Sequence, residues 1–125
     1  GGAGPRGRYL TGGSWHKTGG LGVGFHGRGD SEPWLLWAKG KPRPTGTLSN
    51  AWASPRTAHS EKPVAFLVRV IEALTEPDSL VISLYSGLCP EARAAKATGR
   101  RLIGAEIDPE RHRQALGLLA GHRVR

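Results

Sequence analysis

The second half of the chain shows the clearest periodicity of apolar and polar positions. Apolar side chains recur three or four positions apart at Val64, Leu67, Val68, Ile71 and Leu74. This spacing predicts a helix with one apolar face packed on a sheet. Residues 80–85 (Leu-Val-Ile-Ser-Leu-Tyr) are apolar on both faces except at Ser83, which is typical of a central strand in a parallel sheet.

Residues that start or stop helices divide this half further. Ser60 is a candidate helix cap, and Pro63 is tolerated in the first turn of the helix that follows. A second helix is predicted between Pro90 and Gly99, a second strand over residues 102–107, and a last helix from Asp108-Pro109 to near Ala120. The order strand, helix, strand predicts a βαβ unit of an α/β fold.

The first half of the chain is less regular. Strands are predicted over residues 9–17 and 33–38. Residues 18–30 hold six glycines, and residues 39–55 are rich in Pro, Gly, Ser and Thr. Both of these segments are therefore predicted to be loops.

Charge is distributed unevenly along the chain. Residues 1–62 hold nine basic and three acidic side chains, whereas residues 63–125 hold nine and seven. The basic half also contains all four tryptophans, which suggests a polyanion such as nucleic acid as a partner; a solvated surface rich in arginine is the alternative. We divide the chain into a disordered lead-in (1–8), a strand-and-loop part with DNA-facing basic loops (9–58) and a βαβ part (59–125).

Composition excludes several classes of protein. A single cysteine, Cys89, excludes an internal disulfide and fits a cytoplasmic location, and we interpret it as a small buried residue. No apolar run approaches the roughly 20 residues of a membrane span, and no signal peptide is visible. The five histidines lack the spacing of metal ligands, so no metal site is predicted. The chain has no methionine, even at position 1, which suggests a processed or partial product.

The βαβ unit has the elements of a cofactor site. Gly87 can form a tight turn after the first strand, and Pro90 marks a helix N-terminus close to it. Glu106 ends the next strand, where an acid can bind ribose hydroxyl groups. On this pattern alone, an α/β unit without a ligand is an equal alternative, and an α/β protein that binds another nucleotide is a further one. Asp108 is interpreted from the pattern as the cap of the last helix.

Several segments match, in order, the motifs of one enzyme family. His59-Ser60-Glu61-Lys62-Pro63 matches a His-Pro/Ser-x-x-Lys-Pro motif, and residues 99–108 match a strand of the form Gly-x-Glu-x-Asp. Upstream, residues 15–17, 22–25 and 32–42 resemble the family's last two strands and the loop between them. Residues 9–120 thus resemble the amino-type DNA methyltransferases, in the permuted order of one of their groups.

The resemblance implies a cofactor, a reaction and a set of residues. Family members transfer a methyl group from S-adenosylmethionine to adenine N6 or cytosine N4 of DNA, often in bacterial or phage restriction-modification. The cofactor-binding candidates carried over are His59, Ser60, Lys62, Pro63, Ser83, Tyr85, Gly87, Glu106 and Asp108. The candidates for contacts with DNA phosphates are Arg28, Lys39, Lys41, Arg43 and Arg56.

The chain departs from the family pattern at two motifs. Ser83-Leu84-Tyr85 stands where Asp-Pro-Phe is usual, and Leu88-Cys89-Pro90 replaces Ser-Gly-Thr. The first change removes a carboxylate expected near the methionine amino group. The catalytic Asp/Asn/Ser-Pro-Pro-Tyr/Phe/Trp motif is absent from the sequence, so no catalytic residue is assigned. A catalytically inactive relic that binds DNA or protein is therefore the alternative function.

The resemblance also implies an incomplete sheet. The family's strand order is 3-2-1-4-5-7-6, and this chain provides the equivalents of strands 6, 7, 1 and 2. We therefore expect a partial Rossmann-like fold whose two halves share no strand pairing and whose strand 1 has an open apolar edge. The missing strands would come from an N-terminal segment or a partner chain, unless the sheet is rearranged; a homodimer is a further possibility.

Overall fold

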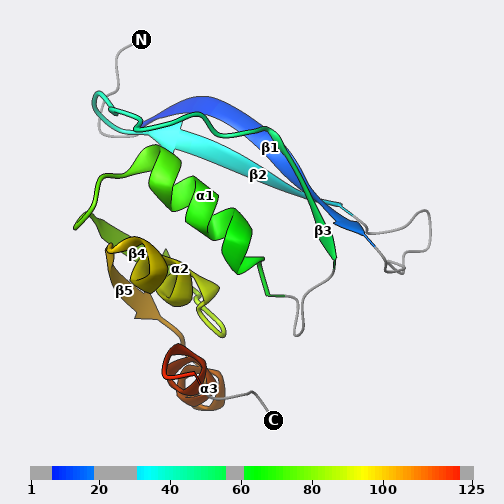
Figure 1. Ribbon diagram of the computed structural model, residues 1–125, viewed down its shortest axis with the longest axis vertical. Helices are drawn as coiled ribbons and strands as arrows, with labels where there is room; N and C mark the ends of the chain where they lie inside the picture. Colours follow the sequence, from blue (N-terminus) through cyan, green and yellow to red (C-terminus); the bar gives the residue numbers. More distant parts are fainter. Residues whose placement is uncertain (1–6, 19–30, 56–60, 122–125) are drawn as a thin grey trace.

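The computed structural model describes residues 7–18, 31–55 and 61–121. Within these ranges the chain forms five strands in two separate sheets and three helices. α1 (Val64–Leu74) lies between the three-stranded sheet and α2, and α3 (Pro109–Leu119) lies beyond the smaller sheet (Figure 1). The predicted α/β class is confirmed.

The larger sheet is formed by three strands of the first half. β1 (Arg8–Thr18) is antiparallel to β2 (Ser31–Ala38) and parallel to β3 (Ala51–Pro55), which gives the order β2-β1-β3. Trp15 on β1 is 3% exposed, and its Nε1 donates a 2.8 Å hydrogen bond to Ser54 Oγ on β3. The buried indole N–H thus has its partner within the sheet.

β3 contradicts the prediction of a continuous loop over residues 39–55. Its five residues read Ala-Trp-Ala-Ser-Pro, and exposed positions alternate with half-buried ones. Trp52 points towards α1, where its ring centroid lies 5.7 Å from that of Phe66. The segment is a strand because it pairs with the distant β1, whereas local composition favoured a loop.

The smaller sheet belongs to the predicted βαβ unit. β4 (Leu80–Leu84), α2 (Pro90–Thr98) and β5 (Arg101–Ala105) follow one another, and the two strands pair in parallel. Each strand ends before the predicted position. The backbone leaves β4 at Tyr85, where φ is 55°.

Two of the three helices have the predicted ends. α2 begins with Pro90 and stops at Gly99, whose φ of 71° is readily adopted by glycine. Asp108 caps α3 by accepting a 3.0 Å hydrogen bond from the backbone N–H of Glu110. α1 differs, because Pro63 occupies its N-cap position and no side chain caps its first turn. Ser60, the predicted cap, lies outside the described residues.

α1 joins the two halves of the chain through its two sides. Phe66 is 8% exposed and packs against Trp34 and Trp52, with ring centroids 6.2 and 5.7 Å away. The opposite side of α1 contacts α2, where Ala94 and Ala95 are 0% and 2% exposed. Small side chains allow close approach of these two helices, so the core runs from the larger sheet through α1 to α2.

The two sheets share no strand pairing among the described residues, as predicted. β4 pairs with β5 alone there, so its other edge is open and the predicted central position is not observed. Ile82 and Leu84 on β4 are 62% and 68% exposed, and Ile103 on β5 is 58% exposed. Ser83, the one polar residue of β4, is buried instead. An apolar strand with an exposed face and an open edge is typical of part of a larger sheet.

Candidate functional site

A polar cavity of about 230 Å³ lies where β4 ends. It is lined by residues 85–88 after β4, Pro90 and Glu91 at the start of α2, Glu61 and Lys62 before α1, and Arg111 on α3. The carboxyl end of parallel strands is the position at which α/β sheets bind their ligands. We call this cavity the strand-end pocket.

The turn after β4 has an unusual backbone. Tyr85, Gly87 and Cys89 have φ angles of 55°, 57° and 51°, in the left-handed region. This region suits glycine, whereas each of the other two residues incurs a steric cost of about 1 kcal/mol. Hydrogen bonds fix the turn, since Ser86 N–H donates to Ala105 C=O on β5 and Cys89 N–H donates to Ser86 C=O. Such strained backbone often lies at functional sites.

Glu106 connects this turn to the end of β5. Its Oε1 accepts a 2.7 Å hydrogen bond from Gly87 N–H, and its Oε2 accepts a 2.9 Å bond from Asp108 N–H. The bonds from Asp108 and Gly87 hold the pKa of the Glu106 carboxyl below its usual range. Glu106 itself does not line the strand-end pocket, but it fixes Gly87, which does.

The predicted cofactor residues divide into three groups. The structure brings Lys62, Tyr85 and Gly87 together around the strand-end pocket. Four others, namely Pro63, Ser83, Glu106 and Asp108, do not line it. His59 and Ser60 lie outside the described residues. Tyr85 is 93% exposed, so its ring is open to solvent at the pocket.

Ser83 packs into the interior rather than facing the pocket. It is 8% exposed and lies close to Cys89, which is 7% exposed. Burial raises the pKa of the Cys89 thiol, which disfavours the reactive thiolate. The structure therefore agrees with our interpretation of Cys89 as a small buried residue.

Lys62 has an acidic partner that the sequence did not indicate. Its Nζ lies 3.0 Å from Glu32 Oε1, and Lys17 Nζ lies 3.3 Å from Glu32 Oε2. Burial raises the pKa of Glu32, but the two ammonium groups outweigh this effect and the net pKa is lowered. The three side chains join β1, β2 and the segment before α1 beside the pocket.

Three further pocket residues were not among the predicted site residues. Glu61 forms an ion pair with Arg93 on α2, and burial lowers the pKa of Arg93. Arg111 lies in the first turn of α3, with its Nε 3.9 Å from Asp108 Oδ2. Glu91 reaches the pocket from the start of α2. No local pattern distinguishes these residues from other charged side chains at helix starts, because only the fold brings them together.

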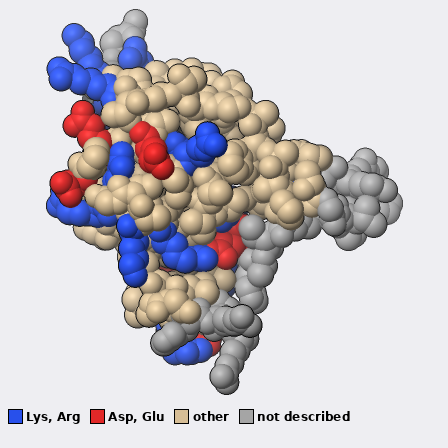
Figure 2. Space-filling model, viewed as in Figure 1, with Lys and Arg blue, Asp and Glu red and all other residues tan. Residues whose placement is uncertain are grey.

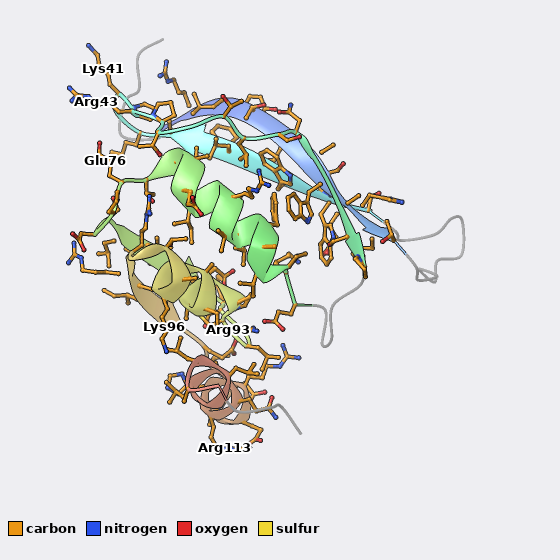
Figure 3. All side chains as sticks on the ribbon, viewed as in Figure 1. Lys41, Arg43, Glu76, Arg93, Lys96 and Arg113 are labelled. Atoms are coloured by element: carbon orange, nitrogen blue, oxygen red, sulfur yellow. The ribbon has the colours of Figure 1, made fainter. Side chains whose placement is uncertain are left out.

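The described DNA-phosphate candidates lie away from this pocket. Lys39, Lys41 and Arg43 are exposed in the loop after β2. Thr45 in the same loop donates hydrogen bonds to the backbone carbonyls of Glu72 and Thr75 at the C-terminal end of α1. Since α1 is about 16 Å long, the loop and the pocket lie at opposite ends of this helix. Figure 3 labels Lys41 in the loop and Arg93, the partner of the pocket residue Glu61.

The surface charges and the two remaining candidates complete this comparison. Figure 2 shows Lys and Arg interspersed with Asp and Glu along one side of the visible face. Arg28 and Arg56 lie outside the described residues. The described structure therefore places three of the five candidates, all in the loop after β2.

A second cavity lies beside this basic loop. It measures about 500 Å³ and is largely apolar, with lining residues that include Leu10, Leu36, Trp37, Pro44 and Leu74. It is larger than the strand-end pocket but offers few polar groups to orient a substrate. The strand-end pocket is therefore the better candidate site.

Two properties of the described residues concern metal sites and membrane-spanning helices. No three His, Cys, Asp or Glu side chains among them are placed to hold a metal ion. None of their helices has the combined length and apolar character required to cross a membrane.

Comparison with known proteins identifies a family. The model of the N6_N4_Mtase family, described as DNA methylase, matches residues 27–117. YubD of Escherichia coli (strain K12) is 35% identical over 90 residues, which are 68% of this chain and 40% of YubD. The DNA adenine methyltransferase YhdJ of the same organism is 29% identical over 94 residues, covering 66% of this chain and 32% of YhdJ. The chain thus spans less than half the length of these two relatives.

A solved structure shows that the fold is shared as well. The crystal structure of an M1.HpyAVI-SAM complex superimposes with a TM-score of 0.72 at 23% sequence identity, covering 88% of this chain and 61% of that one. The partial Rossmann-like methyltransferase fold expected from the sequence is confirmed. Because the family model extends over most of the chain, this protein belongs to the N6_N4_Mtase family of DNA methylases.

Proposed function

We propose that this chain forms the cofactor-binding part of a DNA methyltransferase that acts on adenine N6 or cytosine N4. The proposal rests chiefly on the strand-end pocket, whose Gly87 turn is held by Glu106. S-adenosylmethionine would supply an electrophilic methyl group there. The βαβ part (59–125) would bind this cofactor, and the strand-and-loop part (9–58) would face DNA.

The residues around the pocket fit such a cofactor. Tyr85 offers an exposed aromatic ring on which an adenine can stack. Glu106 does not line the pocket, but its carboxylate retains lone pairs beyond its two backbone bonds, which ribose hydroxyl groups could use. Lys62, Arg111 and Glu91 bring charges of both signs, as a zwitterionic amino-acid group requires.

We further propose that additional polypeptide completes the enzyme. The open edge of β4 suits an adjoining strand, and the exposed side chains of Ile82 and Ile103 suit an element packed on that face of the sheet. That strand would belong to an N-terminal segment, a partner chain or a second copy, and would bring the groups that accept the target amine. DNA would be bound in the cytoplasm by the exposed Lys39, Lys41 and Arg43, together with Arg28 and Arg56.

Calorimetric titration with S-adenosylhomocysteine tests the proposed cofactor site. We expect micromolar binding by the unmodified chain and its loss in Glu106→Ala, because the variant releases the Gly87 turn. Glu76→Gln is a suitable control, since this exposed glutamate lies at the far end of α1 (Figure 3).

Absence of heat at high ligand concentration would contradict the pocket assignment. It would favour the alternative, an inactive relic that binds DNA or protein. The inward position of Ser83, where the family has aspartate, is the observation that supports this alternative. Salt-sensitive DNA binding without cofactor binding would then be expected.

A further inference from the structure

The charged residues around the strand-end pocket are not equally paired. Glu61 pairs with Arg93, Lys62 with Glu32, and Arg111 approaches Asp108. Glu91 is the exception, since it forms no ion pair with any described residue. One carboxylate at the pocket therefore forms no ion pair with a basic side chain of the described structure, although Lys62 and Arg111 line the same cavity.

The carboxylate of Glu91 is also incompletely hydrogen-bonded. Its Oε2 is shielded from solvent and has no hydrogen-bond partner among the described residues. A buried carboxylate oxygen without a partner is costly, and the cost falls when a cationic donor binds to it. Glu91 lines the same cavity as Gly87 and Tyr85, so such a donor can come from a ligand in that cavity.

The position of Ser83 makes this observation relevant to the cofactor. The family pattern places an aspartate there, but Ser83 is buried beside Cys89 and does not reach the pocket. The pocket therefore has a carboxylate from Glu91 in the first turn of α2, whereas β4 provides none. Glu91 is one residue beyond Pro90, the first residue of that helix.

We propose that Glu91 binds the α-ammonium group of the cofactor's methionine moiety, in place of a carboxylate at position 83. This inference rests on the proposed function and assigns a specificity-determining residue to the same site. With Glu91 in this role, the pocket still has a carboxylate for the ammonium group although Ser83 replaces the family's aspartate.

The experiment compares three ligands by calorimetry with the full chain and Glu91→Gln. S-adenosylhomocysteine carries the α-ammonium and α-carboxylate groups, S-adenosylmethionine adds a sulfonium charge, and 5′-methylthioadenosine lacks all three. Glutamine retains the size of Glu91 but removes its charge. We expect Glu91→Gln to weaken S-adenosylhomocysteine binding by about tenfold or more, and to leave 5′-methylthioadenosine binding unchanged.

Glu76→Gln serves as the matched control, because it removes one negative charge at the opposite end of α1. Equal weakening of S-adenosylhomocysteine by both variants would overturn the proposal, as would unchanged binding in Glu91→Gln. Weakening of S-adenosylmethionine alone would assign Glu91 to the sulfonium and overturn the ammonium assignment.

The same titrations separate this inference from the proposed function. If the unmodified chain binds neither adenosyl ligand, both proposals fail. If it binds S-adenosylhomocysteine in a Glu106-dependent manner but Glu91→Gln has no effect, only the assignment of Glu91 fails. Thermal unfolding of each variant, with a midpoint equal to that of the unmodified chain, would exclude an indirect effect of misfolding.

Discussion

The ionisation state of Glu106 affects the stability of the turn after β4. Its carboxylate accepts two backbone hydrogen bonds, which only the ionised form can do fully, and its pKa is lowered by the bonds from Asp108 and Gly87. A group with a lowered folded-state pKa stabilises the fold above its unfolded-state pKa. This contribution disappears as the pH falls through the folded-state value.

We therefore expect Glu106→Gln to lower the urea midpoint near neutral pH, and the difference from the unmodified chain to vanish in acid, well below pH 4.5. Equilibrium unfolding in urea near pH 7 and near pH 3 measures both differences. A gap of equal size at both pH values would contradict this role of the carboxylate. Glu76→Gln, an exposed glutamate at the far end of α1, is the control.

Cys89 shows how a changed motif retains its shape. It stands where the family has a second glycine, yet its φ of 51° is a value that glycine adopts readily. Its side chain fills space next to β5, since a Cβ at Gly104 would lie 3.2 Å from Cys89 Sγ. Because Gly104 has no side chain, the Cys89 side chain fits beside β5. This fit depends on both residues, so neither position predicts it by itself.

At the scale of elements, the sequence predicted those with a strong local pattern. α2 and α3 have sharp boundaries, because Pro90, Gly99 and Asp108 act through their own backbone and side chains. β3 was missed, because its pairing with β1 is set by tertiary contacts and not by its Ala-Trp-Ala-Ser-Pro composition. Elements defined by distant partners require the fold to be known first.

The residues of the candidate site also divide into those with a local sequence pattern and those brought together by tertiary contacts. Gly87 and Lys62 were identified through motifs and do line the pocket. Glu32, Arg111 and Glu91 were missed, because their roles come from side chains that approach from separate elements. A sequence motif reports residues whose spacing is fixed along the chain, whereas counter-charges depend on packing.

α1 is the element on which the integrity of both halves depends. Phe66 contacts Trp34 and Trp52 of the larger sheet, and the other side of the helix packs on α2. We expect Phe66→Ala to reduce the free energy of unfolding by about 3 kcal/mol, through lost burial and a cavity. Tyr85→Ala is the control, because Tyr85 is 93% exposed and its loss should cost little.

Two probes of urea unfolding would test whether α1 couples the halves. Tryptophan fluorescence reports the first half, which holds all four tryptophans, and far-UV circular dichroism reports chiefly the helices of the second half. We expect coincident transitions that Phe66→Ala shifts together. Separate transitions, or a loss below about 1 kcal/mol, would show that α1 does not couple them.

The whole molecule combines a covered interior with an open sheet surface. α1 and α2 are packed between the larger and the smaller sheet, while one face of the β4–β5 sheet and the edge of β4 that points away from β5 have no cover in the described structure (Figure 1). Ile82, Leu84 and Ile103 form this face, and we call it the open β4 face. Apolar patches of this kind mark surfaces that bind other polypeptide.

The open β4 face makes self-association of the isolated chain the expected outcome in the absence of another strand. Ile82→Lys should suppress this association, because a lysine at an edge strand opposes further pairing. It should change the free energy of unfolding by about 0.5 kcal/mol or less, since Ile82 is 62% exposed in the single chain. Sedimentation velocity over a range of concentrations measures the first effect, and urea unfolding at low concentration measures the second. Leu116→Lys provides the comparison, as Leu116 is 56% exposed but lies on α3 and not on β4. Equal suppression by both variants would indicate a general effect of added positive charge, whereas suppression by Ile82→Lys alone would identify β4 as the edge that another strand completes.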